Sequence, residues 1–156
     1  MAQNIQSLWP PDIKATVLSP STILKGQAEA LALQTGGVLL AEILEEKSEE
    51  GDTVLFLDLI APALHASRHR ILRVSHREGM PYPAWVQAEV FQKSIGSSRR
   101  ADTDEEFTAD VAEVLKSPHV LSVAQSLVAR ANEALTSNRT APLSKKTDQV
   151  QCCFII

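Results

Sequence analysis

Histidine and arginine side chains gather in one stretch of the sequence, residues 65–77. His65 and His69 are four residues apart, a spacing that places two imidazoles on one face of a helix and can seat a metal ion. No Asp, Glu or Cys nearby completes a ligand set. We therefore expect no metal and no cofactor at these histidines.

Arginine brings a second kind of chemistry to the same stretch. Its guanidinium group forms paired hydrogen bonds with carboxylates and phosphates. The sequence therefore predicts a candidate site for an anion or an acidic partner, made of Arg68, Arg70, Arg73, Arg77, His65 and His69. The alternative is a solvated connection and strand face. In that case the arginines form surface ion pairs with the acidic turn at residues 45–52.

Hydrolytic catalysis is a third possibility, because Ser67 and Ser75 accompany the histidines. A nucleophilic serine normally stands in a motif such as G-x-S-x-G, and the sequence has none here. We assign no catalytic residue. A small metal-dependent or hydrolytic enzyme that uses His65, His69 and His76 is kept as the last alternative.

One carboxylate, Asp58, lies inside the apolar run LFLDLIAP. Acids in apolar surroundings are usually paired with a base. We expect Asp58 to form an ion pair with an arginine such as Arg73.

Both cysteines of the chain, Cys152 and Cys153, lie in an apolar tail. Cys153 begins the sequence Cys-Phe-Ile-Ile, which resembles a CaaX prenylation motif, and Cys152 is placed to carry a second acyl chain. A single lipid binds membranes only reversibly, and Lys145 and Lys146 supply little positive charge to help it. The tail is therefore either lipidated or docked on the domain or on a partner.

The composition limits the classes of partner. A formal net charge of −4 and an aromatic content of 4% provide neither the basic surface nor the stacking platforms that nucleic-acid binding requires. The N-terminal residues lack the pattern of a secretory signal, and no stretch approaches the ~20 apolar residues of a membrane-spanning helix. We expect a cytoplasmic protein that binds another protein, with membrane association only through Cys153.

The sequence divides into four segments. Residues 1–12 form an irregular lead-in, residues 13–135 one α+β domain, residues 136–151 a polar linker, and residues 152–156 the cysteine-containing tail. This length suits a single domain that needs no disulfide for its stability.

Capping signals mark three helices in the domain. Ser19-Pro20 and Ser117-Pro118 combine an N-cap with a proline at the first helical position, and Thr103 with Glu106 matches a capping box. The first helix is expected to end before Gly36 and the last at about residue 135. The apolar stripe predicted for the last helix is Leu121, Ala124, Leu127, Val128, Ala131 and Leu135. Gly26 lies inside the first helix, where we expect close packing on the sheet to explain it.

Four runs, 38–44, 53–60, 70–76 and 84–91, predict an antiparallel meander with one face covered by helices. In the third run, Leu72 and Val74 share one face and Ile71 lies opposite, beside Arg73 and Arg77. In the fourth run, one face carries Ala84, Val86, Ala88 and Val90. A short edge strand is predicted at residues 13–18, and the polar stretch KSIGSSRRAD after the fourth run is expected to be a connection.

The order of one helix, four strands and two helices resembles that of the ubiquitin-conjugating (E2-like) and RWD superfamily. Tyr82-Pro83 carries the resemblance in sequence, because those families place a similar turn between their third and fourth strands. The resemblance extends over residues 20–135 as topology but only over residues 70–91 as sequence. The body is also similar to small uncharacterised bacterial proteins, which implies no activity.

The chain departs from this pattern where an active E2 enzyme has its catalytic thiol. Residues 92–103 contain no cysteine, and no His-Pro-Asn element precedes them. Without a thiolate, thioester chemistry has no nucleophile. The resemblance therefore implies a non-catalytic relative that acts as a protein-interaction module, engaging a partner through its surface or its tail. The alternative is a prenylated or acylated peripheral membrane protein.

Overall fold

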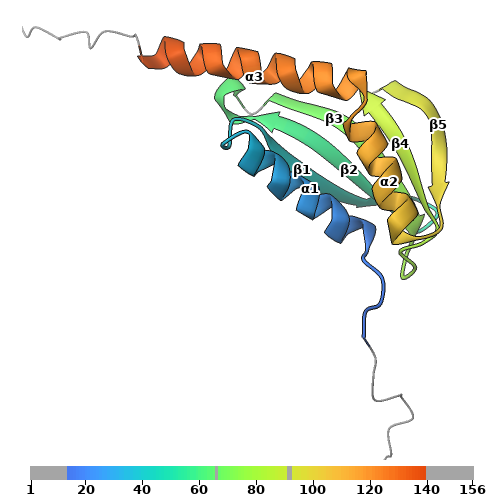
Figure 1. Cartoon of the computed structure of the whole chain (residues 1–156). Helices are drawn as coiled ribbons and strands as arrows, with labels where there is room; N and C mark the ends of the chain where they lie inside the picture. Colours follow the sequence, from blue (N-terminus) through green and yellow to red (C-terminus); the bar gives the residue numbers. More distant parts are fainter. Residues whose placement is uncertain (1–13, 66, 91–92, 140–156) are drawn as a thin grey trace, which may run out of the picture.

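The computed structural model describes residues 14–65, 67–90 and 93–139. In this part of the chain one helix precedes five strands and two helices follow them (Figure 1). The elements are α1 (Pro20–Gln34), β1 (Leu40–Lys47), β2 (Asp52–Ala61), the short 3-10 helix η1 (Pro62–Leu64), β3 (Ser67–Arg77), β4 (Ala84–Val90), β5 (Lys93–Ala101), α2 (Asp104–Leu115) and α3 (Pro118–Arg139).

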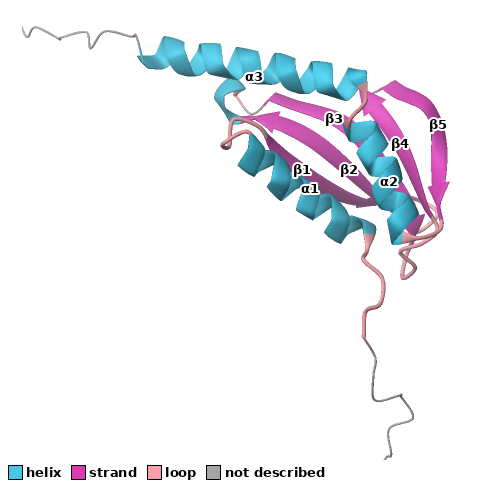
Figure 2. Ribbon diagram, viewed as in Figure 1, coloured by secondary structure: helices cyan, strands magenta, loops and turns pink. Residues whose placement is uncertain are grey.

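The strands form one antiparallel meander in the order β1-β2-β3-β4-β5, so β1 and β5 are its edges. Figure 2 shows α1, α2 and α3 in front of the sheet, on one of its faces. The hydrophobic core lies between the helices and that face, where Leu55, Leu57 and Leu59 of β2 are buried together with Leu24 of α1 and Phe107 of α2. The predicted α+β class is confirmed, but the described sheet has five strands and not four.

The additional strand is β5, which pairs with β4. The prediction of a connection in this stretch was wrong, because only Ile95 and Ala101 of β5 pack against the core and the strand therefore lacks apolar alternation. The edge strand predicted at 13–18 is absent from the described residues 14–18. Instead, the backbone of Leu18 donates to Asp104 Oδ2 at 3.1 Å and accepts a hydrogen bond from Tyr82 Oη at 2.8 Å.

A β-bulge changes which side chains of β3 face the core. Leu57 lies opposite Leu72, whereas the next residue, Asp58, lies opposite Arg70. Ile71 is thus the extra residue, and both Ile71 and Leu72 are buried in the core, at 1% and 0% exposure. The predicted position of Ile71 on the opposite face was wrong, because a bulge breaks the simple two-residue alternation.

The predicted helix starts are confirmed by their capping bonds. Ser19 Oγ accepts from the backbone N–H of Thr22, and Thr103 Oγ1 accepts from that of Glu106. The Glu106 carboxylate in turn accepts from the backbone N–H of Asp102 at 2.8 Å. Reciprocal bonds of this kind satisfy donors that the first helical turn leaves unpaired.

Two details of the helices differ from the predictions. The buried residues of α3 are Val120, Val123, Leu127 and Ala131. Leu121 and Leu135, which were predicted to face the core, are exposed, because the apolar residues of α3 cover a wide arc and the sheet contacts only one side of it. The helix also continues past residue 135 to Arg139. Gly26 is exposed and a Cβ there would meet no heavy atom within 4 Å, so close packing does not explain it.

Within the described ranges, no helix has the length and apolar character needed to cross a membrane.

Candidate functional site

The sheet has a second face that the helices do not cover, which we call the open face. Strand side chains alternate between the two faces, so the residues between core positions point to this side. By the strand register, the open face includes Leu40, Glu42, Leu44, Glu46, Asp52, Val54, Phe56, Asp58, Ile60, Arg68, Arg70, Arg73, Ser75, Arg77, Trp85, Gln87, Glu89, Ser94 and Arg100. All four predicted arginines therefore lie on one surface, supplied by β3.

Asp58 is the buried centre of an ion-pair chain on the open face. Its side chain is 1% exposed, and its Oδ1 accepts from Nε of Arg70 at 3.1 Å. Nη1 of Arg68 lies 3.5 Å from Asp58 Oδ2, and the same guanidinium also contacts Glu42. The predicted pairing of Asp58 with an arginine is confirmed, but Arg73 is not the partner. The bulge shifts the register and brings Arg70 opposite the acid.

Phe56 is covered by the same arginine. The guanidinium carbon of Arg70 lies 3.7 Å from the centroid of the Phe56 ring, a cation–π contact. As a result Phe56 is only 9% exposed, although it lies outside the core cluster and on the open face. Arg70 is thereby fixed between a carboxylate and an aromatic ring, and its positive charge is already paired with that of Asp58.

Arg73 is in the opposite situation. It lies on the central strand, opposite Phe56 on β2 and Gln87 on β4, and it is exposed. Neither the Arg73 side chain nor the Arg77 side chain forms a hydrogen bond or an ion pair with any residue in the part of the chain that the structure describes. The middle of the open face therefore presents an arginine whose charge is available to another molecule.

The histidines of the predicted cluster do not converge. His65 follows η1 with a φ of 55°, and His69 belongs to β3, so the expected shared helical face does not exist. His69 Nε2 lies 3.0 Å from Ser67 Oγ on the side of the sheet that faces the helices. His76 Nδ1 lies 3.0 Å from the carbonyl oxygen of Arg77. The described residues contain no group of three or more His, Cys, Asp or Glu side chains able to hold a metal.

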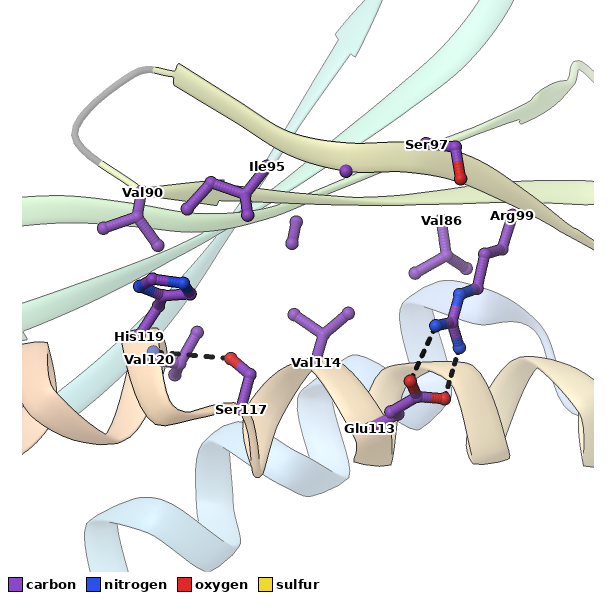
Figure 3. Close-up of a pocket in the computed structure, with 12 residues that line it drawn as sticks. Val86, Val90, Ile95, Ser97, Arg99, Glu113, Val114, Ser117, His119 and Val120 are labelled. Carbon is purple, nitrogen blue, oxygen red and sulfur yellow. Dashed lines mark hydrogen bonds and ion pairs between the residues drawn. The ribbon is translucent and has the colours of Figure 1, made fainter.

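A hollow of about 250 Å³ lies between the β4–β5 hairpin and the junction of α2 and α3 (Figure 3). Val86, Val90 and Ile95 line its sheet side, and Val114 and Val120 line its helix side. Its apolar walls suit a small apolar group.

The polar residues around this hollow are largely paired. Arg99 forms a two-pronged ion pair with Glu113, in which Nη2 lies 2.6 Å from Oε1 (Figure 3). This pair lowers the pKa of the Glu113 carboxyl below its usual value, through the hydrogen bond first and the charge second. His119 also lines the hollow and was not predicted as a site residue. Its only sequence signal is its place directly after the Ser117-Pro118 helix start.

No family model, no curated protein and no solved structure matches this chain. The resemblance to the E2-like and RWD superfamily stays a prediction, and so does the CaaX-like character of Cys152 and Cys153, which lie outside the described residues.

Proposed function

We propose that this protein is a non-enzymatic interaction module whose open face binds an acidic segment of a partner protein. One observation carries this proposal: among the described residues the exposed Arg73 side chain has no partner, and it lies on the central strand of a sheet face that the described helices do not cover. The proposal agrees with the role implied by the resemblance to non-catalytic E2-like and RWD proteins.

The side chains around Arg73 are those that protein interfaces favour. Arginine, tryptophan and phenylalanine are enriched where binding energy concentrates. Trp85 lies two residues from Gln87, the neighbour of Arg73 on β4, and is partly exposed, whereas Phe56, opposite Arg73 on β2, is covered by Arg70. A partner carboxylate on Arg73 would therefore bind beside aromatic surface, where the ion pair is better shielded from water than on an open rim.

The open face carries glutamates on β1 and β4, whereas its acids on β2 are Asp58, which is paired with Arg70 and Arg68, and Asp52, which lies opposite Arg77. Glu42 and Glu46 belong to the edge strand β1, and Glu89 belongs to β4. Like charges raise the free energy of a misplaced acidic segment. We infer that the glutamates direct such a segment along β3, over Arg73, and away from β1.

The test is a titration of the ¹⁵N-labelled protein with a synthetic peptide of alternating Glu and Leu, and with its Lys–Leu counterpart. We expect backbone shifts on β3 and β4 with the acidic peptide only. Arg73→Glu should weaken that binding by about tenfold or more, which corresponds to about 1.4 kcal/mol. Arg130→Glu is the matched control, because Arg130 is an exposed arginine on α3 that also lacks a partner among the described residues.

Three results would overturn the proposal. Equal losses in the Arg73 and Arg130 variants would show attraction by overall charge rather than by a site. Shifts confined to the helices would place binding elsewhere. The mass of the protein could also double as its concentration rises. If Arg73→Glu prevents this doubling, a second copy of this chain occupies the open face.

A further inference from the structure

The helix layer does not close over the sheet, and an apolar groove remains between α1 and α3. Figure 1 shows these two helices apart from one another on the same face of the sheet. The groove holds about 290 Å³, and its floor consists of Ala41, Leu57, Leu59 and Ile71 from β1, β2 and β3. It lies on the opposite side of the sheet from the open face, so it is independent of the function proposed above.

Small side chains keep this groove open. Ala30 on α1, Ala41 on the floor and Ala124 on α3 line it, and larger residues at these positions would fill it. On its α3 wall, Leu121 is 46% exposed. The polar lining residues are Gln27, Gln34 and Lys116. A groove with an apolar floor and an exposed leucine on its wall suits an apolar peptide segment.

We propose that the apolar tail of the same chain, Phe154-Ile155-Ile156, docks in this groove. The sequence between α3 and the tail is polar, whereas the tail combines three large apolar side chains in succession. Burial of such side chains is favourable wherever a complementary apolar surface is within reach.

The distances allow this arrangement. Ala124 lies 15 residues before Arg139, the last residue of α3, which is about 22 Å along the helix. The segment 140–153 spans at most ~46 Å when extended, so it can return along α3 to the groove. A tethered segment also has an effective concentration on the order of millimolar, so that even weak docking is populated.

Docking has a consequence for the tail cysteines. With Phe154 in the groove, Cys153 lies beside α1 or α3 and not at a freely presented position. The docked tail and a lipidated tail are therefore alternative states of the same residues.

The experiment uses the full chain with Cys152→Ser, a nitroxide spin label on Cys153 and ¹³C-labelled methyl groups. We expect selective broadening of the groove methyls of Leu31, Leu59 and Leu121, with those of Val86 and Ile95 unaffected. Phe154→Glu combined with Ile155→Glu should abolish the broadening without altering the domain. Val150→Glu is the matched control in the same segment and should preserve it.

A second pair of variants tests the groove itself. Ala124→Trp should fill it and restore sharp methyl signals. Ala129→Trp makes the same change at an exposed position of α3 and should leave the broadening unchanged.

Uniform or absent broadening in the starting protein would overturn the proposal. The control mixes a chain that carries the spin label but no ¹³C with a chain that carries ¹³C methyl groups but no spin label. Broadening in this mixture would overturn the proposal as well, because the tail of one copy would then occupy the groove of another.

Discussion

At the scale of single residues, one buried carboxylate organises the open face. Asp58 holds Arg70 and Arg68, and Arg70 in turn covers Phe56. Removing one partner of a buried pair leaves the other without compensation, which costs more than the pair itself contributes. The arginines of β3 therefore have different roles: Arg70 and Arg68 maintain the surface, and Arg73 and Arg77 remain available for binding.

This division predicts the effect of Asp58→Asn. The substitution keeps the size of the side chain but removes the charge that Arg70 requires, so we expect a loss of about 2–3 kcal/mol of unfolding free energy, measured by urea denaturation. Glu42→Gln is the matched control, because Glu42 contacts Arg68 at a half-exposed position and should cost less than about 1 kcal/mol. Equal losses in the two variants would contradict the role given to Asp58.

Tyr82 provides a second residue-scale test, because it is the only tyrosine in the chain. Burial, and secondly the charge of Asp104, raise its pKa from 10.0 to about 12. Absorbance of the phenolate should therefore rise with a midpoint near pH 12, and a midpoint near 10 would contradict the packing described for this residue.

The same pKa shift affects stability at high pH. Because the folded pKa is raised, the stabilisation is complete below pH 10 and is lost as the pH rises toward 12. After discounting for the partial exposure of Tyr82, we expect this loss to be about 1 kcal/mol. Tyr82→Phe should remove the pH dependence in this window, and denaturant midpoints between pH 9 and 11.5 would measure it.

At the scale of elements, α1 is capped well but weakened at Gly26. Ser19 satisfies the start of the helix, and Gly37 accommodates its end with a φ of 79°. Gly26 lies between them, exposed, with open space around its Cα. Glycine inside a helix costs about 1 kcal/mol relative to alanine, because a glycine loses more conformational freedom than an alanine when the chain folds.

Gly26→Ala should therefore stabilise the protein by about 0.5–1 kcal/mol. Gly36→Ala supplies the control with the opposite sign, because Gly36 has a φ of 57° and alanine is strained in that conformation. Thermal unfolding followed by circular dichroism compares the two. A neutral or destabilising Gly26→Ala would indicate a contact that the exposed surface of α1 does not show.

Elements also differ in how well sequence alone predicts them. The helix starts at Ser19, Thr103 and Ser117 were predictable because a cap is a local arrangement of neighbouring residues. β5 was not, because an edge strand is defined by hydrogen bonds to β4 and needs few apolar residues of its own. The position of Ile71 depended on the register between β2 and β3, which no local pattern contains.

At the scale of the whole molecule, the fold separates two surfaces. The helices, the core and the apolar groove occupy one face of the sheet, and the arginines of β3 occupy the other. Because the sheet lies between them, substitutions on the open face and in the groove should act independently, as distant sites generally do. The double variant Arg73→Glu, Ala124→Trp should thus lose as much peptide binding as Arg73→Glu alone and as much tail docking as Ala124→Trp alone.

The sequence by itself determined the α+β class, the helix starts, the alternation of β4 and the presence of an arginine cluster, because each depends on residues close together in the chain. It also predicts that both cysteines lie in a tail separate from the domain, in residues outside the described ranges. Tertiary structure decided which arginine pairs with Asp58, that His65 and His69 do not share a helix, and that the exposed side chains of Arg73 and Arg77 have no partner among the described residues. These facts depend on a bulge and on which face of the sheet the helices cover, and both are set by pairing between distant segments.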